Sequence, residues 1–433
     1  MARFIFSLLT VFCYGFAASA DDDDVDARFA AMQARIEQLE QKLVAQSDEL
    51  ASAKQAAATA PVASADQAAA TAPVASATPD VAAEPPGFFD TINVGGFISA
   101  SYFYNFNNPD GGSLGGSNAP VDLLHPDSNS FSLDQVWLTM SRDASAEQRS
   151  GFKAEFVYGK TASILSGDNL DGNAGNDFDI YQGYVTYLAP LGEGVTVQAG
   201  KFATLIGAEV ASSRDNWNIT RGNLYNYFQP INHTGVLAST PLGPVTATFG
   251  FVDETRAFPA TNVDKNNNKA LLFGLSAAGE TVSGSFAGTW GRAPSGAGEH
   301  DKEVILDFIG RWTPSDKVSS YVNFNYLSVE NGADAFLEYN AFGISSAARF
   351  ALTDSTGVAG RIEYLKTNPD AGSDFGIFGL TGTVDHALGG GLTVRGEVRY
   401  DALTESGTLY TGNDGAFDDD SQVTAGVELL YGF

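Results

Sequence analysis

The run VTAGVELLYGF, residues 423–433, alternates apolar residues with small or polar ones along most of its length. The apolar series is Val423, Ala425, Val427, Leu429, Tyr431 and Phe433. Side chains of a β-strand point alternately to its two faces, so this period of two predicts a strand with one apolar face. Residues 392–400 repeat the pattern, with Arg395, Glu397 and Arg399 on the polar face.

Candidate strands of this kind recur along residues 88–433, and the gaps between them alternate in length. The long gaps lie near 107–129, 160–178, 203–233, 253–268, 292–302, 329–336, 366–374 and 403–421. The short gaps lie near 142–150, 190–194, 240–244, 278–280, 313–317, 353–356 and 388–391. Short turns at one end and long loops at the other are typical of bacterial outer-membrane barrels, which close because an unpaired strand edge in lipid is costly. We therefore predict an all-β transmembrane protein, an antiparallel outer-membrane β-barrel of about 16 strands, with about 14 or 18 strands as alternatives.

Composition favours the membrane class over the main alternative, a soluble β-sandwich. Only 18% of the 433 residues are charged, whereas soluble domains have about 25%. The chain has 52 Asp and Glu against 24 Lys and Arg, which argues against a nucleic-acid partner because phosphates are neutralised by clustered basic residues. The single cysteine, Cys13, lies in a segment that we expect to be removed, so the mature chain would lack disulfides and cysteine-ligated metals.

Three segments precede the expected barrel of residues 88–433. Residues 1–20 have a basic start, an apolar centre and a small-residue end, which predicts a secretory signal peptide; a retained anchor is the alternative. Residues 21–51 carry apolar residues at heptad spacing, which predicts a coiled-coil helix. Residues 52–87 are rich in Ala and Pro and contain QAAATAPVASA twice, which predicts a disordered linker.

The coiled coil over 25–50 is too short to be stable alone, so we expect it to join copies of the chain into a homo-oligomer, a trimer in our interpretation. An amphipathic helix lying on another surface is the alternative. Because an even strand number puts both barrel ends on one side, 21–87 is expected in the periplasm, where peptidoglycan is a further expected contact.

The last strand also carries an expected assembly signal. Tyr431 and Phe433 end the chain on the apolar face of that strand. A terminal aromatic residue on an amphipathic strand looks like the signal read by the barrel assembly machinery. The expected surroundings are the lipid and lipopolysaccharide of the outer membrane of a Gram-negative bacterium.

A family resemblance adds to this interpretation. Between 200 and 235 stand the motifs Gly200-Lys201-Phe202, Gly207-Ala208-Glu209, Asn218-Ile219-Thr220-Arg221 and PINHTG. With Gly87-Phe88-Phe89-Asp90 and Val94-Gly95-Gly96-Phe97, these motifs resemble the Putative beta-barrel porin-2 family of Gram-negative outer-membrane proteins. The resemblance covers most of 88–433 loosely and 200–235 best. It implies an outer-membrane channel and names no solute.

The gap 203–233 is too rich in Trp, Leu, Tyr and Phe for a solvated flap, so we expect it to fold into the barrel and narrow the pore. The expected constriction and lumen residues are Glu209, Arg214, Asp215, Arg221, Arg361, Glu363, Arg395, Glu397 and Arg399. Opposed charges at a narrow point would set a local field for passing solutes. Two simpler interpretations stay open: Glu209 and Arg221 pin the loop, and the strand residues form cross-strand pairs.

No cofactor and no metal site is expected, although acidic long loops suggest loosely bound divalent cations. The acids concerned include Asp168, Asp171, Asp177, Asp414 and Asp418 to Asp420. Residues 168–179 do not have the spacing of an EF-hand.

These features favour a porin for passive diffusion of small hydrophilic solutes or ions, and not an enzyme. The alternatives are a barrel with a structural or cell-wall-anchoring role, a trimeric adhesin or exporter, and a barrel hydrolase. A hydrolase needs a histidine placed beside a nucleophile. None of His125, His233, His300 and His386 stands mid-strand beside a serine motif.

Overall fold

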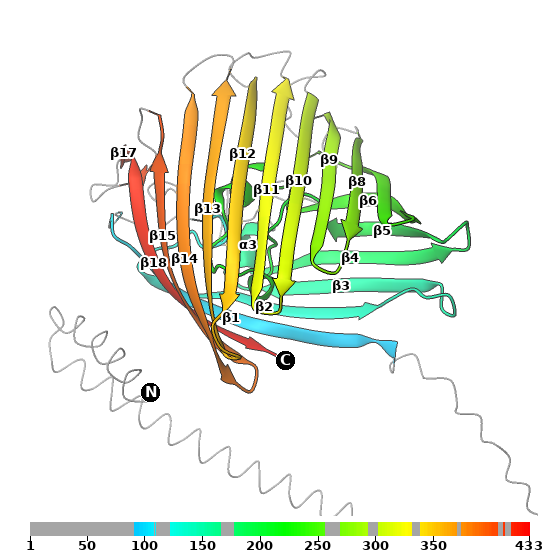
Figure 1. Cartoon of the computed structure of the whole chain (residues 1–433), viewed down its shortest axis with the longest axis horizontal. Coiled ribbons are helices and arrows are strands. Elements are labelled where there is room, and N and C mark those ends of the chain that lie inside the picture. Colours follow the sequence, from blue (N-terminus) through cyan, green and yellow to red (C-terminus); the bar gives the residue numbers. More distant parts are fainter. Residues whose placement is uncertain are drawn as a thin grey trace, which may run out of the picture. The chain divides into compact units, whose positions relative to one another are not determined.

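The computed structural model describes residues 91–107, 109, 122–165, 177–255, 269–292, 302–330, 338–369, 374–405, 410–411 and 417–433. Sixteen strands form one closed antiparallel barrel, in which β1 (Asn93–Asn105) closes on β18 (Ser421–Gly432) (Figure 1). The predicted signal peptide at 1–20, coiled coil at 21–51 and linker at 52–87 lie outside the described residues.

The strand positions agree closely with those predicted from the sequence. The other barrel strands are β2 (Ser130–Arg142), β3 (Ser150–Tyr158), β4 (Phe178–Ala189), β5 (Val195–Ala203), β6 (Asn232–Leu242), β7 (Val245–Val252), β8 (Ala270–Ala278), β9 (Val282–Arg292), β10 (Lys302–Ser315), β11 (Val318–Glu330), β12 (Tyr339–Ala351), β13 (Thr356–Pro369), β14 (Phe375–Gly389) and β15 (Leu392–Leu403). A small extra hairpin, β16 (Tyr410–Thr411) with β17 (Phe417–Asp419), lies in the gap expected to be a plain loop.

The alternation of side chains sorts the two barrel faces as predicted. On β18, Glu428 and Thr424 are buried on the lumen side, whereas Val427 and Leu429 are exposed on the outer face. A closed barrel leaves no unpaired strand edge, so an apolar outer surface can meet lipid without orphaned backbone groups.

The two ends of the barrel meet at the same rim. The Gly96 N–H donates to the Phe433 carbonyl at 3.0 Å, and the Phe433 N–H donates to the Gly96 carbonyl at 3.0 Å. This rim also holds the short connections, such as residues 390–391 between β14 and β15. We call it the short-turn end, and the opposite rim the long-loop end.

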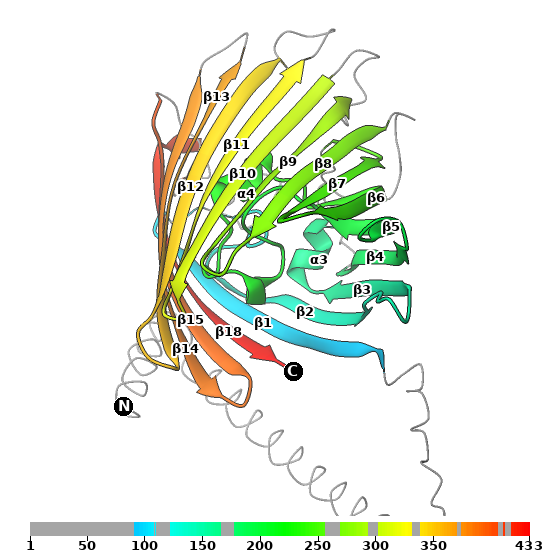
Figure 2. The same cartoon turned by 45° about the vertical axis from the view of Figure 1, so that its right-hand side comes forward.

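In the described parts of the connections lie three short helical segments: α3 (Lys160–Leu165), the 3-10 turn η2 (Ser213–Asp215) and α4 (Asn223–Phe228). Figure 2 shows α3 and α4 inside the ring of strands. Within the described residues, no helix is long and apolar enough to cross a membrane.

Part of the barrel interior is an apolar core. One cluster joins Leu124, Trp137 and Tyr225 with the buried face of α3, and a second joins Leu224 and Phe228 of α4 to side chains of the wall. Burial of apolar surface stabilises a fold by about 25 cal/mol per Å², so these two clusters favour a fixed position for α3 and α4 inside the barrel.

Candidate functional site

The inward loop, residues 204–231, connects β5 to β6 and lies inside the barrel, where it reaches β13, β14 and β15. Its helix α4 sits close to β12, because Gly343 has no side chain: a Cβ there would lie 2.8 Å from Phe228 and 2.9 Å from Leu224. The structure therefore has the segment 203–233 folded into the barrel, as the sequence predicted.

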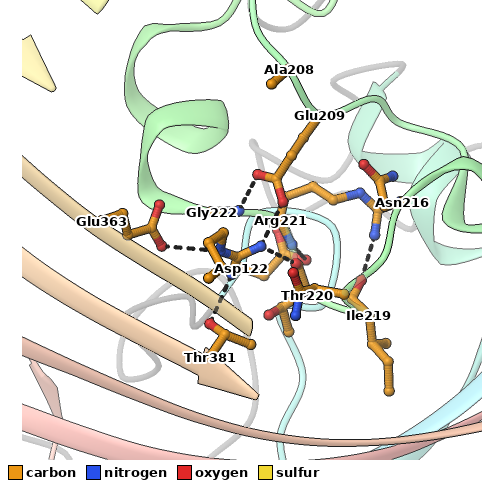
Figure 3. Close-up of polar contacts among 12 residues, drawn as sticks. Asp122, Ala208, Glu209, Asn216, Ile219, Thr220, Arg221, Gly222, Glu363 and Thr381 are labelled. Carbon is orange, nitrogen blue, oxygen red and sulfur yellow. Dashed lines mark hydrogen bonds and ion pairs between the residues drawn. The ribbon is translucent and has the colours of Figure 1, made fainter. Parts of the chain in front are cut away.

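The centre of the loop is tied to β13 by an ion pair (Figure 3). Arg361 donates from Nη1 to Glu209 Oε1 at 2.6 Å and to the Thr220 carbonyl at 2.8 Å. Its Nη2 donates to Thr381 Oγ1 at 3.0 Å, and its Nε lies 3.5 Å from Glu363 Oε1. The Arg361 side chain is fully buried, so its charge is compensated by the loop and is not presented to the lumen.

The start of α4 is held by two further wall residues. Glu363 Oε2 accepts the Asn223 N–H at 2.7 Å. Arg399 donates to the Arg221 carbonyl at 2.6 Å and to Asp401 at 2.7 Å. Hydrogen bonds to charged groups are each worth about 1.5–3 kcal/mol, so these contacts fix the local backbone strongly.

The segment before α4 is held by β15 in the same manner. Glu397 accepts the N–H groups of Ile219 at 2.6 Å and Thr220 at 3.1 Å. Arg395 donates to the carbonyls of Asn216 at 2.9 Å and Ser213 at 3.0 Å, and pairs with Glu428.

Arg221 binds the loop itself. It donates to the carbonyls of Ile219 at 2.5 Å, Ala211 at 2.6 Å and Val210 at 2.9 Å, and its side chain is fully buried. A guanidinium offers five donors in a fixed plane, which suits it to gathering several carbonyls of one turn. In the structure Glu209 pairs with Arg361 of the wall, whereas Arg221 binds carbonyls of the loop itself.

Gly222 stands between two carboxylates. Its N–H donates to Glu209 Oε2 at 2.7 Å, and a Cβ at this position would lie 2.4 Å from Glu363 Oε2. The lack of a side chain at Gly222 therefore lets both carboxylates approach its backbone, whose φ of −71° is open to any residue.

Residues 122–125, in the connection between β1 and β2, contact the inward loop. Asp122 accepts the Arg221 N–H at 3.0 Å and contacts His125 Nδ1 at 2.7 Å, while His125 Nε2 lies 4.0 Å from Asp134. Burial raises the pKa of Asp122, but His125 and Arg221 outweigh it and hold that pKa at about 2. Burial lowers the pKa of His125, but the two carboxylates outweigh it and leave that pKa raised.

Two of the predicted site residues stand apart from this network. The side chains of Arg214 and Asp215 are 43% and 55% exposed and lie 3.6 Å from each other. The Arg214 guanidinium lies over the Phe97 ring, 5.3 Å from its centroid. Asp215 is one of the residues that line a recess of about 220 Å³, together with Ala208, Glu209, Asn216, Trp217, Asn218, Arg311 and Tyr321.

The structure thus gathers seven of the nine predicted residues around the loop backbone. These are Glu209, Arg221, Arg361, Glu363, Arg395, Glu397 and Arg399. Sequence reasoning did not find Asp122, Asn223, Asp401 and Glu428 as partners. The period-two pattern puts Glu428 on the lumen face with Arg395, but only the register of β15 with β18 makes them neighbours.

The described residues hold no group of three or more His, Cys, Asp or Glu side chains able to bind a metal ion. Asp168, Asp171 and Asp414, for which loosely bound divalent cations were expected, lie outside the described residues.

A closed barrel of sixteen antiparallel strands, apolar outside and polar within, is the architecture of an outer-membrane porin. The chain belongs to the family described as Putative beta-barrel porin-2, OmpL-like, whose profile matches residues 91–433. The resemblance noted from the motifs is thereby confirmed, and the protein is an outer-membrane channel by family.

Solved structures share the fold at low sequence identity. The trimer form of OmpT from Vibrio cholerae is 12% identical with a TM-score of 0.55, covering 79% of this chain and 99% of that one. An anion-selective porin from Comamonas acidovorans is 16% identical with a TM-score of 0.54, covering 79% and 99%. The outer-membrane channel DcaP of Acinetobacter baumannii is 11% identical with a TM-score of 0.54, covering 79% and 97%. A search of curated protein sequences found no match.

Proposed function

We propose that the barrel admits small hydrophilic solutes or ions by passive diffusion and that the inward loop is its constriction. The observation that carries this proposal is a set of hydrogen bonds between the loop backbone and buried charged side chains of β13 and β15. A loop held at so many points keeps one shape in a water-filled lumen, and a fixed shape is what a size-selective pore needs.

The proposal divides the predicted site residues into two roles. The seven residues around the loop backbone hold the constriction in place, since they are buried and bonded to the loop. Arg214 and Asp215 are exposed, so they act on passing solutes through their charge.

Single-channel recording in a planar bilayer tests the channel, and reversal potentials in asymmetric salt report the sign of the charge at the constriction. We expect large, stable conductance steps. A purified, folded barrel that gives no steps would favour the alternative of a structural or anchoring protein.

Hydrolysis is disfavoured by the surroundings of the described histidines. Ring nitrogens of His125, His233 and His386 contact Asp122, Thr204 and Thr356 respectively. None of these three contacts brings a serine hydroxyl to a histidine, as serine-based hydrolysis requires. His300 lies outside the described residues.

We further propose that the short-turn end faces the periplasm, with 21–87 on that side, and that the chain forms a trimer. The common rim of both barrel termini and the trimer form of the Vibrio cholerae protein support this. Removing 21–87 and measuring the oligomer mass checks the role of the coiled coil at 25–50. A shortened chain that is still a trimer would leave that segment the other expected role, contact with peptidoglycan.

The contacts expected outside the barrel are part of the same proposal: lipopolysaccharide and loosely bound divalent cations at the acidic long loops, and the barrel assembly machinery at Tyr431 and Phe433. Tyr431 and Phe433 are exposed on the outer face, where another protein can reach them. A calcium titration followed by the unfolding temperature checks the cation sites.

A further inference from the structure

Arg311 on β10 is a lumen cation that takes no part in an ion pair among the described residues. Its side chain is exposed, and within the described part of the chain it makes one hydrogen bond, from Nη2 to the Ala208 carbonyl at 3.2 Å. No carboxylate of the described residues lies within 4.0 Å of it. Since a guanidinium carries five N–H donors, Arg311 keeps donors free for a ligand.

The anionic groups near Arg311 are already engaged. Glu209 accepts from Arg361 and from the Gly222 N–H, and Asp215 lies 3.6 Å from Arg214. Asp307, four residues before Arg311 on the same face of β10, is buried and accepts from Asn323 at 2.5 Å and Asn325 at 2.7 Å. A positively charged solute would have to compete with Arg361 or Arg214 for its carboxylate, whereas the Arg311 guanidinium forms no ion pair with a described carboxylate that an anion would have to displace.

An aromatic pair forms the adjoining wall of the recess. Tyr321 is the direct cross-strand partner of Arg311, and its ring stacks on Trp217 of the inward loop with centroids 5.4 Å apart. Trp217 is partly exposed at the recess. The recess therefore offers a charged hydrogen-bond donor for an anion, the Arg311 guanidinium, beside the apolar face of an aromatic ring.

The amides at the same recess are engaged elsewhere. Asn216 donates to the carbonyls of Val210 and Ser212, and Asn218 donates to Thr383. They shape the recess and leave recognition to the guanidinium and the ring.

We infer that this recess is a selectivity site for small organic carboxylates with an apolar or ring-shaped face, with Arg311 as the residue that recognises the carboxylate. The inference rests on the proposed function, because the solute reaches the recess through the lumen. A guanidinium binds a carboxylate with two parallel hydrogen bonds, which a neutral solute of the same shape cannot reproduce.

Benzoate and its neutral analogue benzamide are the probes, added to the full-length channel in a planar bilayer. We expect benzoate to reduce the mean current at concentrations about tenfold lower than benzamide, as one charge-assisted bidentate contact provides. R311Q should remove this difference, R311K should keep only part of it, and W217A should weaken the effect of both solutes.

The matched control is R349Q, which removes another lumen arginine, one that is paired with Asp385 at 2.7 Å. R349Q should leave the preference for benzoate in place. If R311Q and R349Q lose the preference for benzoate over benzamide equally, or if R311Q keeps it, the assignment of the site is overturned. The heat-modifiable band of each variant shows that the barrel has folded.

Calorimetric titration of the detergent-solubilised barrel separates this inference from the proposed function. Conducting channels without a benzoate preference would overturn the site alone. A folded barrel that does not conduct but binds benzoate through Arg311 would keep the site and overturn the channel.

Discussion

Glu209 and Arg361 meet at 2.6 Å although 152 residues separate them in the chain. One comes from the inward loop and the other from the wall strand β13, so their contact fixes how far the loop extends across the lumen. The pair is buried, and removing one partner of a buried pair costs about 3–5 kcal/mol because the other charge loses its compensation.

Replacing Glu209 with Ala should therefore free the loop while leaving the barrel closed. We expect the single-channel conductance to rise and the open-channel current to become noisier, since the Gly222 N–H loses its acceptor as well. The matched control is Glu147→Gln in the exposed connection between β2 and β3. A quiet channel of unchanged conductance in Glu209→Ala would show that the other contacts hold the loop without this pair.

Gly222→Ala should loosen the same region by crowding. The new Cβ would lie 2.4 Å from Glu363 Oε2 and 2.9 Å from Glu209 Oε2, so both carboxylates have to shift. Overpacking of this kind costs about 1–3 kcal/mol, which would lower the unfolding temperature measured by loss of the heat-modifiable band. Gly396→Ala is the control, because a Cβ there meets nothing within 4 Å. Equal unfolding temperatures for the two variants would refute the close approach.

The strands were predictable because each one carries a period-two signal over about ten residues, long enough to be distinguished from chance. β18 and β15 also have clean polar faces, so Glu428, Arg395 and Arg399 could be placed on the lumen side in advance. The face of a strand, however, does not identify a partner. That Arg361 would bind Glu209 and the Thr220 carbonyl depends on the path of the loop, which is decided by tertiary contacts.

The inner helices were not predictable for a related reason. α3 and α4 have six residues each, too few to show a helical period and too few to be stable alone. They form because Ile164 and Leu224 are buried against the wall. The apolar content of 203–233 gave the general position of the loop, and the resemblance motifs coincide with its anchoring residues Glu209 and Arg221.

The buried pair of Asp122 and His125, called the latch below because Asp122 also accepts the Arg221 N–H of the inward loop, predicts that the stability of the folded barrel depends on pH. The pKa of His125 is raised from 6.5, so its stabilising contribution is complete below that value and is lost as pH rises through the folded-state pKa. The pKa of Asp122 is lowered from 3.8 to about 2, so its contribution is present above 3.8 and is lost as pH falls toward 2. The latch is therefore strongest between these two ranges.

We expect the unfolding temperature of the barrel to fall as pH is raised from 6.5 into the alkaline range, because the raised pKa of His125 lies above 6.5. His125→Gln should be less stable at pH 6 and should show a flatter profile over this range. His386→Gln is the control, since the contact that the described residues give its ring is to the Thr356 hydroxyl and not to a carboxylate. Parallel profiles in wild type and His125→Gln would mean that this histidine does not titrate in the folded barrel.

The seam between β1 and β18, where the barrel closes, ends at Phe433. Phe433 exchanges both backbone hydrogen bonds with Gly96, and its side chain is 59% exposed on the outer face. The substitution Phe433→Ala keeps the backbone bonds and removes only the exposed ring, so the stability of the assembled barrel should change little. If the assembly machinery recognises the ring, Phe433→Ala should nevertheless lower the amount of folded barrel in the outer membrane several-fold.

The matched control is Leu388→Ala, which removes an apolar side chain that is 49% exposed near the same rim. Quantifying the heat-modifiable band in outer-membrane fractions measures the yield, and refolding into detergent measures the intrinsic stability. A large loss of stability in detergent would assign Phe433 to holding the seam together, and equal yields from the two variants would remove its role as an assembly signal.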